Sequence, residues 1–182
     1  MTVRETTIPG VLLIEPAVYG DERGFFVETF QTERYAEAGM PTSWAQLNHS
    51  RSRQHTLRGL HTQIRQPQGK LVRVARGAVY DVILDLRPKS PTFGEWEAHD
   101  LDDVAHRQLW VPPGLAHGFC VTSETADVVY ACTSLYDPAD ESGVAWDDGD
   151  LGIPWPTASP LVSEKDQRLP RLAEMSAFPQ VA

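Results

Sequence analysis

The sequence predicts an all-β fold, a sandwich or barrel with only a few short helices. Strand-like segments recur about every ten residues, with turn-forming Gly, Pro and Asp between them. The clearest strand is 78–86, where Val79, Asp81, Ile83 and Asp85 alternate with apolar residues. One face of this strand therefore carries two carboxylates among aliphatic side chains.

The first third of the chain is expected to hold two strands and the only early helix. The strands are 11–14 and 25–30, separated by a polar turn at 20–24. Residues 31–38 carry helix formers and stop at Gly39, as helices commonly do. The remaining expected strands, in chain order, are 44–48, 56–63, 71–75, 94–99, 108–111, 118–121 and 127–136.

We expect residues 1–182 to form one domain. The length suffices for one hydrophobic core, and no flexible linker, low-complexity tract or internal repeat separates a second unit. From about residue 137 the sequence is rich in Asp, Gly and Pro and lacks a sustained period. This part is expected to form ordered loops that wrap the barrel.

Composition argues for a protein of the cytoplasm. The net charge of -9 and pI near 5.0 argue against nucleic acid or an anionic membrane as the main partner. No apolar run approaches the roughly 20 residues of a membrane-spanning helix. Cys120 and Cys132 stand in apolar alternating contexts without a C-x-x-C pair or a signal peptide, so free buried thiols are expected.

Positive charge is concentrated in one part of this acidic chain. Residues 38–80 contain no Asp or Glu but seven of the sixteen basic residues. This asymmetry favours a local site for a small anion. Within it lies TLRGLHTQIRQPQGKLVRVAR, in which His61 falls on a predicted strand close to basic residues. We interpret His61 as functional, although a hydrogen-bonded core histidine is the alternative.

A second histidine, His117, stands in VPPGLAHGF. This segment resembles the second sequence motif of the cupin superfamily, and residues 59–77 resemble the first motif loosely. Metal-binding cupins supply H-x-H and a Glu from the first motif, whereas here Gln63 occupies the second His position and no Glu is near. Two histidines without a carboxylate make a poor metal site, so we predict a cupin without metal or other cofactor.

A closer resemblance covers residues 11–166. The runs DERGFFVETF, QLNHS, LRGLH, PQGKLVRVARGAVYDVILDLR, VPPGLAHGF, YACTSLYDP and SEKD resemble, in this order, the dTDP-4-dehydrorhamnose 3,5-epimerase family. The resemblance implies a metal-free jelly-roll cupin, a dTDP-linked nucleotide-sugar substrate, and a homodimer with exchanged N-terminal strands. Its reaction inverts carbons 3 and 5 of a 4-keto sugar through an enolate.

The resemblance also implies the roles of four residues. His61 is the base that removes a proton, and Tyr130 is the acid that returns one from the opposite face. Lys70 stabilises the charge on the carbon 4 oxygen. Asp166 pairs with His61 and sets its tautomer; Asp81 and Asp85 remain alternatives for this pairing. Without the resemblance, Tyr130 would be taken for a core residue with a hydrogen-bonded hydroxyl.

Further matched positions would hold the substrate. Arginine suits the pyrophosphate because its guanidinium fork matches phosphate oxygens. The substrate contacts implied by the resemblance are Arg23, Glu28, Gln46, Asn48, Arg58, His117, Tyr136, Glu141 and Lys165.

Two departures from the family pattern leave alternatives open. Thr62 follows the predicted base where an aromatic residue is common, and Leu47 stands in a triplet that is often polar there. Neither change removes a proton-transferring group, but both affect the shape of the pocket. The alternatives are a relative that inverts a single centre and a cupin that only binds nucleotide sugars. A metal-dependent cupin is disfavoured by Gln63.

Overall fold

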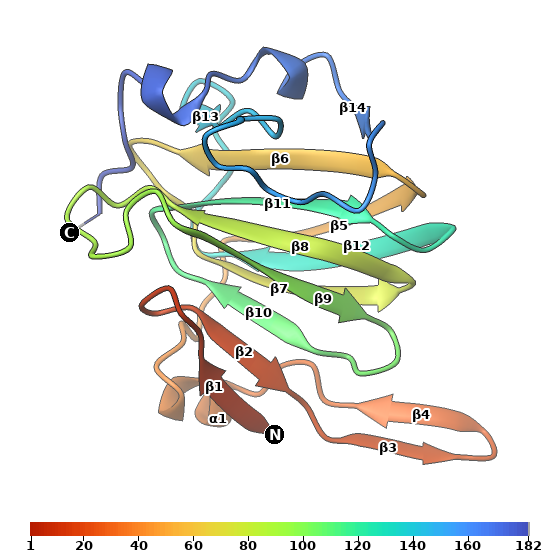
Figure 1. Cartoon of the computed structure of the whole chain (residues 1–182). Coiled ribbons are helices and arrows are strands. Elements are labelled where there is room, and N and C mark those ends of the chain that lie inside the picture. The colour runs from red at the N-terminus through yellow and green to blue at the C-terminus, as the bar shows by residue number, and fades with distance from the viewer. Residues whose placement is uncertain (182) are drawn as a thin grey trace.

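The structure, a computed structural model, describes residues 1–181 and is built from two facing antiparallel sheets (Figure 1). The first sheet runs in the order β1 (Thr2–Glu5), β2 (Leu12–Glu15), β10 (Gln108–Val111), β7 (Lys70–Arg76), β12 (Thr125–Cys132) and β5 (Gln46–Arg53). The second runs β13 (Glu141–Gly143), β6 (Thr56–Gln63), β11 (Leu115–Val121), β8 (Ala78–Asp85) and β9 (Trp96–Asp102), with β14 (Leu161–Val162) beside β6. The chain is thus nearly all-β, as predicted, in a cupin-like arrangement.

The core lies between the two sheets and follows from the alternation of the strands. Val72 on β7 and Leu109 on β10 meet Val79, Ile83 and Phe119 of the second sheet, all of them buried. The intervening residues of β8 point the other way, into a second apolar cluster beneath the C-terminal segment. Both faces of β8 are therefore buried, and the carboxylates of its first face lie inside the protein.

Short helices and loops cover the outer faces of the sheets. Helix α1 (Thr32–Glu37) starts after its N-cap Gln31 and packs Tyr35 against the first sheet. The C-terminal segment, with η1 (Asp166–Arg168) and η2 (Leu172–Glu174), lies over β6 and the second sheet (Figure 1). No helix among residues 1–181 is long and apolar enough to cross a membrane.

Several expected elements match the structure and others needed correction. The helix and the strands 56–63 and 108–111 have the predicted bounds within a residue. The strand expected at 44–48 is β5, which continues to Arg53 because its whole length pairs with β12. The strand expected at 127–136 ends at Cys132, and residues 28–30 leave β4 (Gly24–Val27) to pack beside α1. Strand β1 was not predicted.

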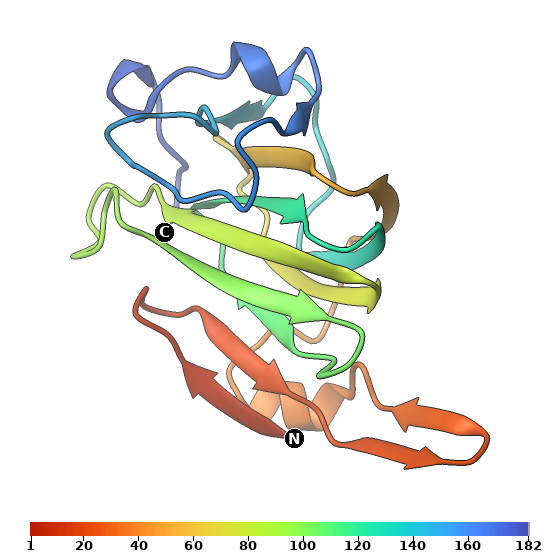
Figure 2. The same ribbon diagram turned by 45° about the vertical axis from the view of Figure 1, so that its right-hand side comes forward.

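The hairpin of β3 (Val18–Asp21) and β4 was predicted only in its second strand. It extends away from the two sheets and forms a separate two-stranded sheet (Figures 1 and 2). Tyr19, Phe25 and Phe26 are 59 to 68% exposed on it, so most of its aromatic surface is uncovered in the single chain. The ring of Phe25, near the turn of the hairpin, lies 4.4 Å from the ring of His106.

Candidate active site

A pocket of about 320 Å³ opens between the two sheets. The strands β5, β6, β7, β11, β12 and β13 line it, together with the loops before β7 and after β12 and one residue from the C-terminal segment. Most of the residues singled out from the sequence meet here. The predicted residues that line the pocket are Gln46, Asn48, Arg58, His61, Lys70, His117, Tyr130, Tyr136, Glu141 and Lys165.

Strand register brings these side chains together. His61 on β6 is the register partner of His117 on β11. On the opposite sheet, Tyr130 of β12 pairs with Asn48 of β5, and Lys70 of β7 lies opposite Cys132. Since paired residues of neighbouring strands project to the same face, both histidines face the tyrosine and the lysine across the pocket.

His61 forms a dyad with Asp166. The ring Nε2 lies 2.8 Å from Oδ1 of Asp166, and Oδ2 accepts the backbone N–H of Gly59 at 3.1 Å. Burial raises the pKa of the Asp166 carboxyl, but the bonds from His61 and Gly59 outweigh it and hold the pKa below its usual value. The carboxylate is therefore ionised at neutral pH and accepts the ring proton.

The other two carboxylates considered for this pairing have different partners. Asp81 binds the ring of His117, with Nε2 at 3.0 and 2.9 Å from its two oxygens. Asp85 accepts hydrogen bonds from Arg87 and from the turn that follows β8. Asp166 is thus the residue of the three that contacts His61.

The dyad depends on the close approach of β6 and β11. Gly59 has a φ of +113°, and a Cβ atom built there would lie 2.6 Å from the Cα atom of Gly118. Only glycine fits such a position. Its N–H then points at Asp166, so the backbone of β6 holds the carboxylate beside the histidine two residues later.

Lys70 and Tyr130 are free to meet a ligand. Neither side chain has a hydrogen-bond partner among residues 1–181. Burial lowers the pKa of the Lys70 ammonium, while the nearby Cys132 and Asp81 act in the opposite direction. Burial also raises the pKa of the Tyr130 hydroxyl, so this group keeps its proton at neutral pH and is available as an acid.

Hydrogen bonds already organise the pocket mouth. Lys165 Nζ donates to both oxygens of Glu141 at 2.8 and 2.9 Å, and the Tyr136 hydroxyl donates to the same carboxylate at 2.8 Å. On β5, Gln46 donates to Asn48 at 2.8 Å. These groups present a hydrogen-bonded polar rim of mixed charge, suited to a ligand that has both donors and acceptors.

The comparison with known proteins identifies the family. The family model described as dTDP-4-dehydrorhamnose 3,5-epimerase matches residues 5–174. The chain belongs to this family. The enzyme of this name from Pseudomonas aeruginosa is 48% identical over 181 residues, which cover 98% of this chain and 100% of the relative. A dTDP-4-dehydrorhamnose 3-epimerase from Streptomyces niveus is 44% identical, over 96% of this chain and 85% of the relative.

A solved structure agrees over the whole chain. The Legionella pneumophila dTDP-6-deoxy-D-glucose-3,5-epimerase in complex with dTDP-4-keto-L-rhamnose has a TM-score of 0.95 and 44% identity, and the match covers 100% of this chain and 98% of that one. The fold and the family of the chain are thereby established.

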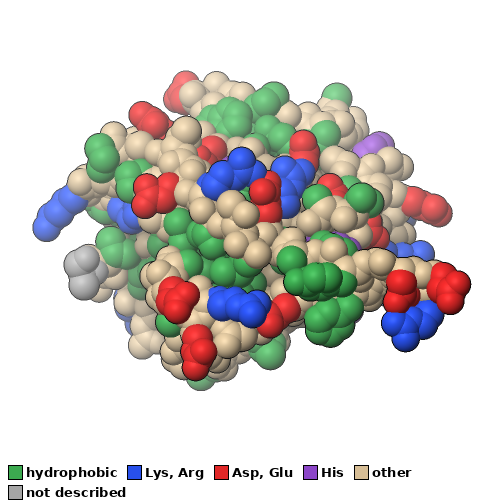
Figure 3. Space-filling model, turned by 90° about the horizontal axis from the view of Figure 1, so that it is seen from below, with side chains coloured by type: hydrophobic (Ala, Val, Ile, Leu, Met, Phe, Trp, Pro, Cys, Tyr) green, Lys and Arg blue, Asp and Glu red, His purple; other side chains and the backbone are tan. Residues whose placement is uncertain are grey.

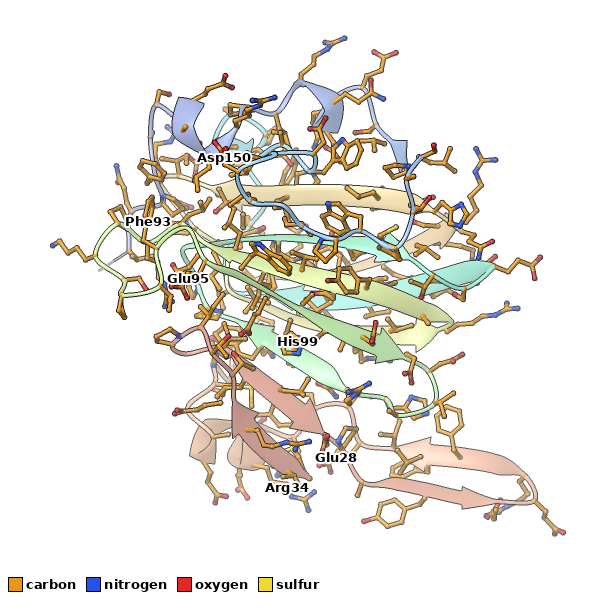
Figure 4. All side chains as sticks on the ribbon, in the orientation of Figure 1. Glu28, Arg34, Phe93, Glu95, His99 and Asp150 are labelled. Atoms are coloured by element: carbon orange, nitrogen blue, oxygen red, sulfur yellow. The ribbon has the colours of Figure 1, made fainter. Side chains whose placement is uncertain are left out.

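Two predicted contacts of the epimerase family lie outside the pocket of their own chain. Arg23 stands at the tip of the β3–β4 hairpin, where it is paired with Asp21 at 2.6 Å and its side chain is 85% exposed. Glu28 is paired with Arg34 at 2.7 Å, and Figure 4 places both in the lower part of the molecule, beside α1. The hairpin leads away from the sheets, which is why neither residue turns inward.

The site does not suit the metal of other cupins. Gln63 donates its amide to the carbonyls of Gln66 and Leu135 and accepts the N–H of Asp137, so its polar atoms hold a turn. Residues 1–181 contain no group of three or more His, Cys, Asp or Glu placed to hold a metal ion.

Some lining residues were missed in the sequence. Ser50 shares the inner face of β5 with Gln46 and Asn48, and the two-residue period of a strand was the signal for it. Phe119 follows His117 by two residues on β11, so the same period indicates it, whereas no pattern in the sequence indicates Gln68. Thr62, noted above as a departure, lies at the pocket wall.

Proposed function

We propose that this chain is a dTDP-4-dehydrorhamnose 3,5-epimerase that converts dTDP-4-dehydro-6-deoxy-D-glucose to dTDP-4-dehydro-L-rhamnose, in dTDP-L-rhamnose biosynthesis. The observation that carries the proposal is the His61–Asp166 dyad facing a free Tyr130 across a pocket that also holds Lys70. The pocket thus has a base on one wall, and an acid and a cation on the opposite wall.

The chemistry follows from the ketone at carbon 4. His61 removes the proton from carbon 3, and the electrons of that C–H bond pass into the carbonyl to give an enolate. Lys70 stabilises the negative oxygen. Tyr130 then donates its proton to the other face of carbon 3, which inverts the centre and restores the ketone. Solvent returns a proton to Tyr130 and takes one from His61.

The same groups repeat the exchange at carbon 5. Each inversion replaces one hydrogen by another, so the overall reaction is an isomerisation without oxidation or reduction. Asp166 accepts the ring N–H and stabilises the imidazolium formed when His61 takes a proton. Arg58, whose Nε is bound to Ser52 at 3.1 Å, keeps its terminal nitrogens for the pyrophosphate.

A homodimer with exchanged hairpins accounts for the two residues outside the pocket. Arg23 and Glu28 would then enter the pocket of the partner. The exposed Tyr19, Phe25 and Phe26 support this assembly, because aromatic surface of this kind is rarely left in water. Seen from below, a patch of hydrophobic side chains lies next to the group of acidic and basic side chains that projects at the right of the view (Figure 3).

Mixing two inactive variants tests this assembly. Arg23→Ala and His61→Asn each impair the enzyme, but a mixed dimer has one pocket with both native residues if hairpins are exchanged. Random mixing after unfolding and refolding should therefore restore about a quarter of the wild-type sites. A hairpin that serves its own pocket gives no restoration, because every pocket then carries one substitution.

Isotope exchange tests the reaction itself. The protein is incubated with dTDP-4-dehydro-6-deoxy-D-glucose in deuterated water, and deuterium at carbons 3 and 5 is counted by mass spectrometry and NMR. Label at both carbons supports the double epimerase. Label at carbon 3 alone would favour the activity named for the relative from Streptomyces niveus, and no label would favour a binding protein.

The buried thiols Cys120 and Cys132 fit the proposed location in the cytoplasm.

A further inference from the structure

A second histidine–carboxylate pair faces the pocket beside the catalytic dyad. His117 and Asp81 lie on neighbouring strands β11 and β8, and the Asp81 side chain is completely buried. His117 is its only hydrogen-bond partner among residues 1–181. Burying a carboxylate lowers the stability of the folded protein unless its charge is paired. A pair of this kind is not needed for folding, which favours a functional role.

The geometry determines which ring nitrogen of His117 reaches the pocket. Asp81 is acceptor-only when ionised, so Nε2 at 2.9 Å must carry a proton. The other nitrogen, Nδ1, has no hydrogen-bond partner among the described residues, and His117 lines the pocket. Nδ1 is therefore the atom that a ligand meets.

Asp81 also influences the opposite wall. Its negative charge attracts the ammonium of Lys70, which has no partner of its own among residues 1–181. His117 is in turn the register partner of His61. A single buried carboxylate thus acts on His117, which lies beside the predicted base, and on Lys70, which lies across the pocket from it.

We propose that Asp81 is a positioning residue for the epimerisation: it keeps the His117 proton on Nε2 and thereby presents Nδ1 to the sugar ring of the substrate. This inference rests on the proposed function. It extends that function because it assigns a role to a side chain that does not itself touch the ligand. By the family resemblance, residues of β5 such as Gln46 and Asn48 contact the nucleotide end of the substrate rather than the sugar.

Asp81→Asn tests the proposal. The amide of the variant places an N–H donor against Nε2, which moves the ring proton to Nδ1 and turns an acceptor toward the sugar into a donor. We expect kcat/KM for the keto sugar to fall about 10- to 100-fold, with affinity for dTDP, which lacks the sugar, within about twofold. Asp85→Asn is the matched control, since Asp85 is equally buried on the same strand but holds Arg87.

Two further measurements keep the proposal testable if Asp81→Asn folds poorly. Nitrogen NMR of the histidine-labelled wild type, assigned with His117→Asn, should show protonated Nε2 and bare Nδ1 on His117. In the His117→Asn background, adding Asp81→Asn should produce no further loss of rate, because a positioning residue acts through its target.

The outcomes separate this inference from the function on which it rests. A wild-type protein that does not exchange protons with the keto sugar overturns the function. An active wild type whose Asp81→Asn variant matches Asp85→Asn in rate overturns only the role of Asp81. So does a His117 ring protonated at Nδ1 alone, or equal rate losses from Asp81→Asn with and without His117.

Discussion

Replacing Asp166 by Asn should nearly abolish turnover while leaving the nucleotide site intact. The carboxylate accepts two bonds, from His61 Nε2 at 2.8 Å and from the Gly59 N–H at 3.1 Å. In Asp166→Asn the amide oxygen still accepts the Gly59 N–H, so the NH₂ group is directed at Nε2. The histidine proton then moves to Nδ1, and the ring presents an N–H where the substrate proton must be accepted.

The size of this effect follows from the loss of the correct tautomer. A comparable change in serine proteases lowers kcat about 10⁴-fold, and we expect a loss of about 10³- to 10⁴-fold here. This loss corresponds to about 4 to 5.5 kcal/mol of barrier at about 1.4 kcal/mol per factor of ten. Initial rates of deuterium exchange measure it, and calorimetry with dTDP should show an affinity within about twofold of wild type.

The control is Asp148→Asn. Asp148 is also buried and accepts a backbone N–H, that of Leu172 at 2.8 Å, but it contacts no histidine. It should lose stability without losing rate. The dyad would be refuted as the source of activity by an Asp166→Asn variant that is folded, binds dTDP and turns over within threefold of wild type.

Three other predictions concern the acid, a buried charge and a glycine. Tyr130→Phe keeps the base and should slow inversion about 10²- to 10³-fold, yet still wash deuterium into carbon 3 without inversion; inversion at wild-type rate would rule out Tyr130 as the acid. Burial raises the pKa of Asp85, but bonds from Arg87 and the following turn bring it to about 2, below the usual 3.8. Its stabilising effect, about 2 kcal/mol, is therefore complete above about pH 4 and lost as the pH falls through 2. Urea unfolding of Asp85→Asn should show this deficit at pH 7, shrinking toward zero near pH 2, and equal stability at pH 7 would contradict it. Gly59→Ala should fail to fold or lose several kcal/mol, because its Cβ would lie 2.6 Å from Gly118 at a φ of +113°; a soluble variant with the wild-type melting temperature would contradict the close approach.

The sequence indicated the regular parts of the fold because their burial is periodic. Residues 78–86 alternate strictly, and β8 occupies 78–85 with both faces buried. Helix α1 has a clear stop at Gly39. Strand β1 could not be found in this way, since a short polar edge strand such as Thr2–Glu5 has no apolar face to detect.

The candidate site was harder to derive, because its key contacts join distant parts of the chain. His61 and Asp166 are 105 residues apart, and nothing local distinguishes Asp166 from Asp81 as a partner. The tertiary fold makes the choice, because β8 lies beside β11 and its Asp81 binds His117, whereas η1 lies against β6 and its Asp166 binds Gly59 and His61. The positions of Arg23 and Glu28 depend on the direction of the hairpin, which the turn at 20–24 does not encode by itself.

Asp166 lies in the last tenth of the chain, and this position has a consequence for the synthesis of the protein on the ribosome. The five strands that form most of the pocket wall have been synthesised once β12 is made, but Asp166, the predicted partner of His61, follows more than thirty residues later. We therefore expect the chain to become catalytically competent only when its synthesis is nearly finished.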